Sequence, residues 1–215
     1  MSDVMSATEH IRSTPARERA ADAIRSSALE CAITLLTTGG AKALSVRSLA
    51  DALGTSTKII YSHFGGMPQV IAGVYAHAYQ SLLERLEVAD DINVSRVERL
   101  WRVARGYREY AMGEPHLFAL LFEQPAIDAR REDVPDGRAH PAVPLVSRII
   151  APANTSGATA DTARLQAHAF CATVHGPVEL ERSGWLDSGA DHVFDTVVTQ
   201  AIRAAIALPA RLGRP

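Results

Sequence analysis

Hydroxyl, cationic and aromatic side chains gather in two short segments between Ser45 and His63. Such groups can donate hydrogen bonds to phosphate oxygens, and the N-terminus of a helix favours the same negative charge. Arg47 adds a planar guanidinium that matches O6 and N7 of guanine in a DNA major groove. The candidate DNA-contacting residues are Ser45, Arg47, Ser56, Thr57, Lys58, Ile59, Tyr61, Ser62 and His63.

Two short helices must position these side chains. We expect them at 45–53 and 56–62, where Ser45 and either Thr55 or Ser56 can accept a hydrogen bond from a first-turn N–H. Only a glycine and its neighbours separate the two helices, which is typical of a helix-turn-helix. A helical bundle with solvated polar faces is the alternative that these residues leave open. The expected shared core consists of Val46, Leu49, Ala50, Leu53, Ile60 and Phe64.

The rest of the chain has the periodicity of an all-α protein. Apolar residues recur at three- and four-residue spacing almost throughout, which predicts about nine helices and no sheet. We expect a three-helix DNA-binding domain at 16–66 and a second helical domain at 67–210. The first helix is expected to end at Gly39-Gly40. The expected helices outside the two short ones are 16–38, 68–88, 94–112, 115–123, 145–150, 161–183 and 190–208, with a loop at 124–144 and a linker at 153–159.

Composition favours a globular cytoplasmic protein. The chain has 215 residues, is 47% hydrophobic and carries a net charge of −2. We find neither the apolar segment of a signal peptide nor the ~20 apolar residues of a membrane span. Cys31 and Cys171 lie among apolar residues, which favours buried free thiols over a disulfide or a zinc site. Because residues 1–66 hold seven basic and six acidic residues, DNA binding must depend on a local patch.

No catalytic, metal or cofactor site is predicted. The Gly39–Lys42 segment lacks the Ser or Thr of a phosphate-binding loop, and the sequence has no Gly-x-Ser-x-Gly, His-Glu-x-x-His or Cys-x-x-Cys motif. His168, His175 and Glu179 fall roughly on one helical face and could meet a metal or an effector. Because Gly176-Pro177 should bend or break that helix, we favour hydrogen-bonded core histidines.

The block SVRSLADALGTSTKIIYSHF resembles the tetracycline-repressor (TetR) family, and the resemblance extends over about residues 16–75. It fits the pattern S-x-R-x-L-A-x-x-L-G-x-S-x-x-x-x-Y-x-H-F at every specified position. The resemblance implies that 56–62 is the recognition helix and that Tyr61 and His63 contact the DNA backbone. The family usually has Lys at Met67, so the backbone N–H groups beside Gly65-Gly66 would have to bind that phosphate alone. The residues implied to face base edges are Arg47, Thr57, Lys58 and Ile59.

The C-terminal half carries a second resemblance. EPHLFALLFE and ATVHGPVELERSG resemble the ligand-binding half of a TetR subgroup with a Trp-His-Gly-like signature, although Val174 stands in place of the Trp. In that subgroup the second domain carries an effector pocket and the dimer surface. Aromatic side chains at helical spacing fit either a plain core or such a pocket. The candidate pocket residues are Trp101, Tyr107, Phe118, Phe122, Phe170 and His175.

The resemblance implies a DNA-binding transcriptional repressor that a small-molecule effector releases from a palindromic operator. A homodimer is expected through 161–183 and 190–208, where small and apolar residues let helices approach closely. The alternative, left open by Met67, is a helical small-molecule-binding or scaffolding protein that no longer reads DNA. The residues expected at the dimer interface are Ala163, Ala167, Cys171, Ala172, Phe194, Val197, Val198, Ala201 and Ala205.

Overall fold

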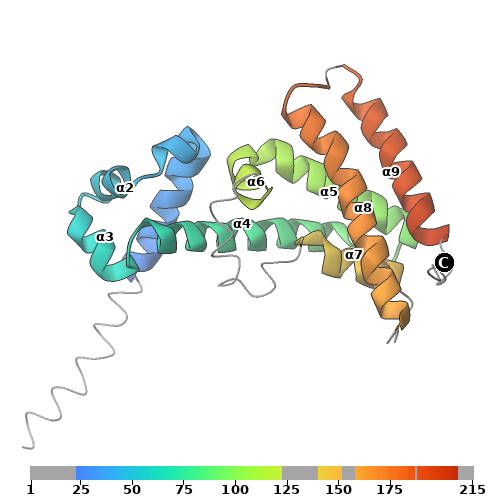
Figure 1. Ribbon diagram of the computed structural model, residues 1–215, viewed down its shortest axis with the longest axis horizontal. Helices are drawn as coiled ribbons and strands as arrows, with labels where there is room; N and C mark the ends of the chain where they lie inside the picture. The colour runs from blue at the N-terminus through green and yellow to red at the C-terminus, as the bar shows by residue number, and fades with distance from the viewer. Residues whose placement is uncertain (1–22, 123–139, 152–157, 187, 208–215) are drawn as a thin grey trace, which may run out of the picture. The chain divides into compact units, whose positions relative to one another are not determined.

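The computed structural model describes residues 23–122, 140–151, 158–186 and 188–207, and every regular element within these ranges is a helix (Figure 1). The predicted all-α fold is therefore confirmed. The chain divides into two compact units, residues 1–76 and residues 77–215. No helix in the described part of the chain is long and apolar enough to cross a membrane.

Unit 1 contains a helix over residues 23–39, the 3-10 turn η1 (Ala41–Ala43), α2 (Val46–Ala52), α3 (Thr57–Phe64) and the first part of α4 (Met67–Ala89). The first helix ends before Gly40, which takes a positive φ of 69°. The part of this helix expected at 16–22 lies outside the described residues. The buried core of unit 1 includes Ala28, Ala32, Leu36, Leu49, Ala50, Ile60, Val70 and Val74.

The helix α4 continues across the division between the two units. Contacts place that division after Ala76, whereas the sequence suggested a boundary between residues 66 and 67. The reason is the packing of the first turns of α4 on the helix 23–39. A Cβ added to Gly73 would lie 3.2 Å from Leu29 Cδ1, so the two helices approach closely at this glycine.

Unit 2 contains the rest of α4 followed by α5 (Arg96–Gly113), α6 (Pro115–Phe122), α7 (Ala142–Ile150), α8 (Ala158–Arg182) and α9 (Ala190–Ala207). The helix α8 packs against both α7 and α9, and α5 contacts all three (Figure 1). The helix α7 begins three residues earlier than predicted, because the apolar run that it buries already starts at Ala142 and Val143. The expected loop at 124–144 lies mostly outside the described residues.

Arg108 joins three helices of unit 2. From α5 it donates two hydrogen bonds of 2.6 Å to the carboxylate of Glu181 on α8, and it lies 2.7 Å from Asp191 on α9. Its guanidinium also stacks 4.9 Å from the ring centre of Phe194. The bond to Glu181 raises the pKa of Arg108 above its ordinary value. This bidentate pair, whose side chains are 21% and 20% exposed, joins α8 to α5, and the contact with Asp191 joins α9 to α5.

The structure contradicts the expected break in α8 and the expected burial of one cysteine. The helix α8 continues through Pro177 without a break. The turns of α8 before and after Pro177 stay helical. Both cysteines are free thiols, but only Cys171 is buried, because Cys31 is half-buried on the helix 23–39.

The predicted dimer stripe is also wrong, because most of it is buried within one chain. The helix α8 uses these small residues to pack against α7 and α9, so they are not available to a second copy. Only Ala172 is exposed, and Val197 is half-buried. The buried members of the stripe are Ala163, Ala167, Cys171, Phe194, Val198, Ala201 and Ala205.

Candidate nucleic-acid interface and ligand site

A reciprocal hydrogen-bond pair begins α2. The N–H of Ser48 donates to Ser45 Oγ at 3.1 Å, and the N–H of Ser45 donates to Ser48 Oγ at 2.9 Å. This capping box satisfies two N–H groups that the helix itself cannot bond. It confirms the predicted role of the Ser45 hydroxyl as a cap. It also fixes the first turn of α2, on which the exposed side chain of Arg47 lies.

A tight turn leads from α2 to α3. Gly54 takes a positive φ of 62°, and Ser56 is the N-cap residue of α3. The Ser56 hydroxyl makes no capping hydrogen bond, so the expectation that Thr55 or Ser56 caps α3 with its side chain is wrong. Its φ of −97° and ψ of 153° are those of a normal N-cap, and its side chain is exposed.

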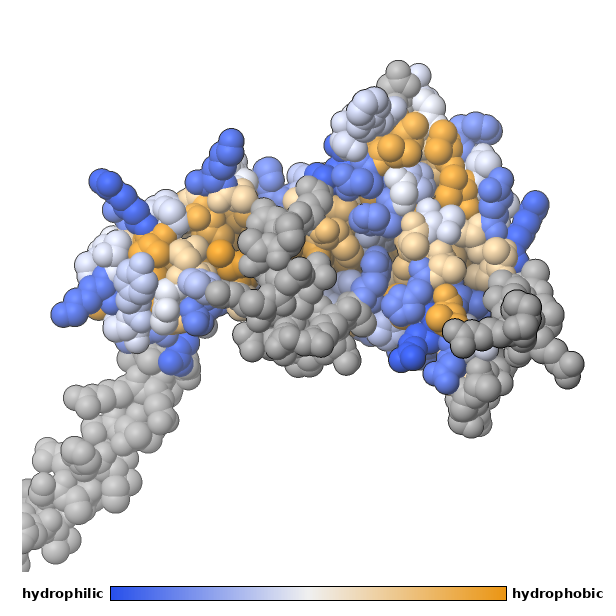
Figure 2. Space-filling view, in the orientation of Figure 1, coloured by the Kyte–Doolittle hydropathy of each residue, from blue (hydrophilic) through white to orange (hydrophobic). Residues whose placement is uncertain are grey.

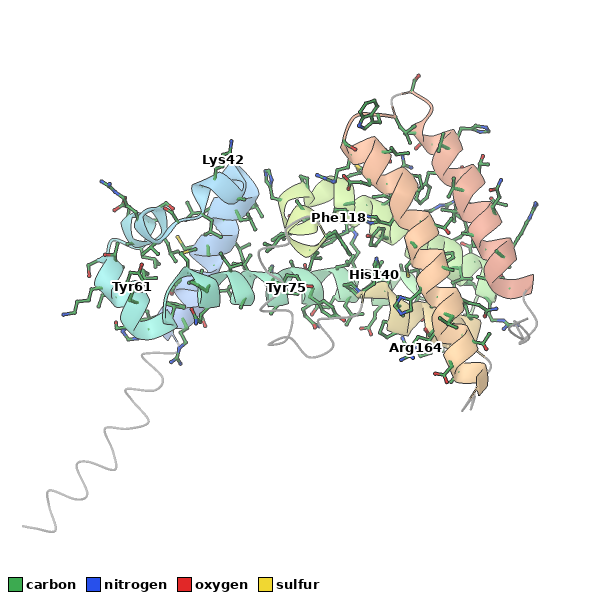
Figure 3. All side chains as sticks on the ribbon, viewed as in Figure 1. Lys42, Tyr61, Tyr75, Phe118, His140 and Arg164 are labelled. Atoms are coloured by element: carbon green, nitrogen blue, oxygen red, sulfur yellow. The ribbon has the colours of Figure 1, made fainter. Side chains whose placement is uncertain are left out.

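The helix α3 has an outward face and a face turned into unit 1. Ile60 is fully buried, whereas Tyr61 is 58% exposed (Figure 3). Ile59 and His63 instead line a groove of about 440 Å³ that also includes Ala23, Ile24 and Ser27 of the first helix. The predicted contact residues therefore separate into two groups. Those on the outward face of α3 are Thr57, Lys58, Tyr61 and Ser62.

The outward side of the two helices is basic. Residues 41–66 hold three basic residues, Lys42, Arg47 and Lys58, and one acidic residue, Asp51. Neither Arg47 nor Lys58 forms an ion pair with any residue that the structure describes. Figure 2 shows hydrophilic side chains projecting over α2 and α3. These cations are thus available to neutralise phosphates.

Two glycines shape the end of α3 and the start of α4. Gly65 ends α3 in the left-handed conformation, with φ 76°, and its N–H donates to the carbonyl of Tyr61. Gly66 has φ 116°, and a Cβ there would lie 3.3 Å from Cε1 of Tyr61. The absence of a side chain at Gly66 therefore lets the Tyr61 ring lie against the turn. The Arg25 side chain donates to the His63 carbonyl at 3.3 Å, which ties the first helix to the end of α3.

An aromatic cluster occupies the interior of unit 2. Tyr107 of α5 lies 5.4 Å from Phe118 and 5.9 Å from Phe122 of α6, measured between ring centres. Its hydroxyl lies 2.8 Å from Nδ1 of His175 on α8. His140, just before α7, completes the cluster at 5.5 Å from Tyr107 and 5.1 Å from Phe122 (Figure 3). The structure therefore brings together four of the six candidate pocket residues.

The other two candidates lie in different places. Phe170 lines a cavity of about 10 Å³ together with Tyr107, His140 and Cys171, so it adjoins the cluster. Trp101 instead packs 6.5 Å from Phe194 of α9, with Arg105 over its ring. Trp101 thus forms part of the α5–α9 contact and not of the aromatic cluster.

Burial shifts the pKa values of the titratable groups in this cluster. Burial, with smaller contributions from His175 and His168, lowers the pKa of His140 to about 4. Burial also raises the pKa of Cys171 to about 12 and that of Tyr107 above its ordinary value. All three groups are therefore uncharged at neutral pH. Among the described residues, no group of three or more His, Cys, Asp or Glu side chains is arranged to hold a metal ion.

The sequence did not identify His140 as a site residue. It falls inside the segment expected to be a loop, where no helical periodicity connects it to other residues. Its neighbours Tyr107 and His175 are 33 or more positions away along the chain. Only the packing of α5, α6 and α8 brings these rings together. Burial of its imidazole lowers the pKa of His140, and this distinguishes it from an ordinary loop histidine.

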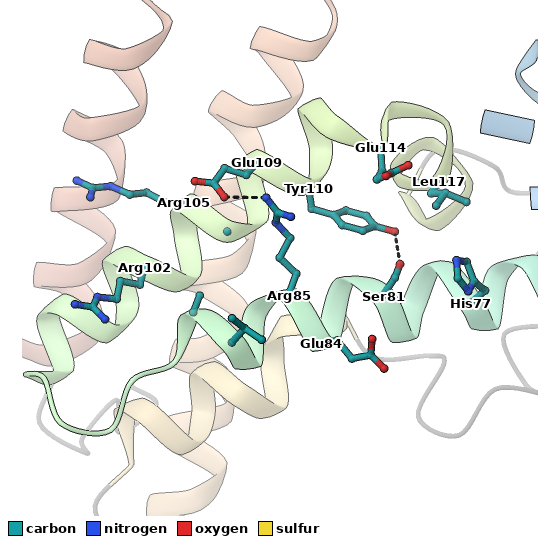
Figure 4. A pocket seen from close by; sticks show the side chains of 13 residues that line it. His77, Ser81, Glu84, Arg85, Arg102, Arg105, Glu109, Tyr110, Glu114 and Leu117 are labelled. Carbon is teal, nitrogen blue, oxygen red and sulfur yellow. Dashed lines mark hydrogen bonds and ion pairs between the residues drawn. The ribbon is translucent and has the colours of Figure 1, made fainter. Parts of the chain in front are cut away.

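A second, more open cavity lies between α4, α5 and the start of α6 (Figure 4). It has a volume of about 750 Å³. Arg85 pairs with Glu109 across it at 3.0 Å, and the hydroxyls of Ser81 and Tyr110 lie 2.9 Å apart. Its lining includes three arginines and three glutamates, whereas ligand sites usually have only a few polar groups among apolar ones. The aromatic cluster is therefore the better candidate for a ligand site.

Comparisons with known proteins agree with this architecture. Residues 28–74 match a family model described as bacterial regulatory proteins of the tetR family. Residues 100–204 match a model described as a tetracyclin repressor-like C-terminal domain. A search of curated proteins found no significant match.

Solved structures show the same fold. The regulatory protein SCO4313 shares 23% identity at a TM-score of 0.66, covering 86% of this chain and 97% of that chain. A TetR-like transcriptional regulator from Rhodococcus sp. RHA1 shares 18% identity at a TM-score of 0.62, covering 86% and 98%. The multidrug binding protein EbrR, complexed with imidazole, shares 18% identity at a TM-score of 0.57, covering 87% and 92%.

Proposed function

Since the chain belongs to the TetR family of DNA-binding transcriptional regulators, we propose that it is a repressor that a small-molecule effector releases from its operator. The observation that supports DNA reading is the outward face of α3 with its unpaired cation Lys58, beside Arg47 on α2. Arg47, Thr57 and Lys58 would face base edges and phosphates, and Tyr61 would contact the DNA backbone. Ile59 and His63, which line a groove within unit 1, would contribute less.

We assign the dimer surface to an exposed face of α8. This face carries an apolar residue at each end, Leu165 at 69% and Leu180 at 46% exposure, with small residues between them. Spacings of three and four residues place them on one side of the helix, and Gly176 has open space where a Cβ would be. Figure 2 shows apolar residues over α8 and α9. The members of this α8 face are Leu165, Ala169, Ala172, Gly176 and Leu180.

If a second copy packs on this α8 face, α8 and α9 of the two copies would form a four-helix interface with two-fold symmetry. Small residues allow two helices to approach closely, and stable dimers bury about 1,200–2,000 Å² in total. A two-fold dimer presents two copies of α3, which matches a palindromic operator. The chain would thus read DNA as a homodimer.

We place the effector in the aromatic cluster of Tyr107, Phe118, Phe122, His140 and His175. EbrR, a multidrug binding protein of the same fold, is solved with imidazole bound, which supports a small-molecule site in this chain. We also propose that the chain belongs to the Trp-His-Gly subgroup, because its sequence contains Val174-His175-Gly176.

The route to the DNA-binding helices would run through α5 and α4. Tyr110 lies one turn beyond Tyr107 on α5. Its hydroxyl donates to the Ala78 carbonyl at 3.0 Å and lies 2.9 Å from the Ser81 hydroxyl, and both of these residues are on α4. A ligand that moves Tyr107 would therefore also move the anchor of α4. Such a ligand shifts operator affinity only by its preference for one of the two conformations.

DNA binding tests the proposal. We would measure affinity for the DNA upstream of the chain's own gene, and for random DNA, in wild-type protein, Arg47→Ala and Tyr61→Phe. Arg47→Ala should cost about 1–3 kcal/mol and relax the preference at one base position in each half-site. Tyr61→Phe should weaken binding to all sequences alike.

Arg148→Ala, which removes an exposed cation of α7, is the matched control and should change neither affinity nor preference. Equal affinity of the wild-type protein for upstream and random DNA would contradict the proposed function. That result would favour a helical binding protein that no longer reads DNA.

A further inference from the structure

The tautomer of His140 follows from a backbone contact. The N–H of Ala142 donates to Nδ1 of His140 at 3.2 Å, so Nδ1 carries a lone pair and no proton. Burial lowers the pKa of His140 to about 4, and the ring is therefore neutral at pH 7. A neutral imidazole with an unprotonated Nδ1 carries its proton on Nε2. Nε2–H is thus a hydrogen-bond donor.

This donor is buried and unsatisfied. Nε2 of His140 has no hydrogen-bond partner among the residues that the structure describes. Buried polar groups are nearly always paired, so an unpaired one in a native protein calls for a partner. The cavity beside it, of about 10 Å³, has no charged side chain in its lining. The rings of Tyr107 and Phe122 lie within 5.5 Å of the imidazole, centre to centre.

We propose that the ligand of this site is an uncharged, planar molecule that accepts a hydrogen bond from His140 Nε2–H. A neutral acceptor such as a ketone or amide oxygen satisfies the donor, and a flat ring can stack among the aromatic side chains. An anion or a cation would lose its hydration without gaining a counter-charge in the lining. The inference deepens the proposed function, because it names the class of effector that this site takes.

Binding requires the cluster to open. A cavity of about 10 Å³ has room for a single water molecule, so a ligand ring must displace a side chain. Phe122 is the aromatic residue best placed to move, since it is half-buried and ends α6. Its neighbour Phe118, by contrast, is fully buried. Entry at Phe122 therefore disturbs the end of α6 before it disturbs the core.

Four phenyl compounds of similar size test the proposal: acetophenone, isopropylbenzene, benzoate and 1-phenylethylamine. The first offers a neutral acceptor, the second none, and the last two carry a negative and a positive charge. By calorimetric titration of the full chain, acetophenone should bind about tenfold or more tightly than the other three, which corresponds to about 1.4 kcal/mol.

Two variants isolate the donor. His140→Asn keeps an oxygen to accept the Ala142 N–H but has no group at the Nε2 position, so acetophenone should lose its advantage over isopropylbenzene. His140→Gln places an amide N–H near the Nε2 position and should keep part of it. A long-range ¹H–¹⁵N spectrum of histidine-labelled wild-type protein should show His140 protonated at Nε2, with that signal shifted by acetophenone.

Equal binding of acetophenone and isopropylbenzene, no binding of acetophenone at millimolar concentration, or a proton on Nδ1 would overturn the proposal. Operator binding by the same samples separates the two claims. A protein that binds its operator but shows no preference for an acceptor refutes only the ligand class. A protein that prefers the ketone but does not bind upstream DNA refutes only the proposed function.

Discussion

Acidification should destabilise the protein through His140. In the folded chain its pKa is about 4, against an ordinary histidine value of 6.5. Between these two values the unfolded chain binds the proton and the folded chain does not, so stability must fall as the pH falls. The contribution of His140 is complete above pH 6.5 and is lost as the pH drops towards 4. The gap between the two pKa values corresponds to a loss of about 3 kcal/mol.

Urea unfolding from pH 7 to pH 4.5, followed by tryptophan fluorescence at one protein concentration, measures this loss. His140→Asn should be less stable than the wild type at pH 7, because Asn fills the aromatic cluster less well. Its stability should then fall less steeply with acid, so that the two proteins converge near pH 4.5. His192→Asn, which removes an exposed histidine of α9, is the control and should keep the wild-type slope. An equal slope in wild type and His140→Asn would show that His140 is not held neutral by burial.

Three other changes test the framework of unit 2. Arg108→Met should lower the free energy of unfolding by about 2–3 kcal/mol. This loss is smaller than for a fully buried ion pair, because Glu181 stays partly solvated. An unchanged urea midpoint would contradict the role of Arg108 in joining three helices. Leu180→Asp should give a monomeric mass by light scattering at micromolar concentration, whereas Ile92→Asp, an exposed apolar residue between α4 and α5, should leave the dimer intact; a dimeric Leu180→Asp would exclude the α8 face. Tyr110→Phe removes two hydrogen bonds to α4 and should cost about 1–2 kcal/mol of stability. It should also reduce the effect of a bound effector on operator affinity while leaving effector affinity nearly unchanged, and an unaltered effect would exclude the route through Tyr110.

The sequence predicted the local features of the chain well. The Ser45 cap and the helix end at Gly40 can be predicted from residue type alone, because an N-cap hydroxyl and a left-handed glycine depend on a few adjacent residues. The spacing of Leu49, Ala50 and Ile60 likewise predicts the inward faces of α2 and α3, which the structure confirms. These inferences need no knowledge of distant contacts.

Contacts between distant residues were harder to predict. Small residues such as Ala167 and Ala201 let helices approach closely, but they do not show whether the neighbouring helix comes from the same chain or another one. Trp101 has the helical spacing of a pocket residue, yet the rotation of α5 turns it towards Phe194. His140 lies where the sequence has no periodicity at all. Its role depends on an approach to Tyr107 and Phe122 that only tertiary packing creates.

Hydroxyl-radical footprinting on the DNA upstream of the gene tests the central claim most directly, because it reports both DNA reading and dimerisation. A two-fold dimer carrying α3 on each copy should protect two equivalent half-sites, centred about one helical turn, ~34 Å, or somewhat more apart. Arg47→Ala should weaken both protected regions together. A single asymmetric region, or no protection where the wild-type protein is in excess, would contradict the account of the chain as a dimeric operator-binding repressor.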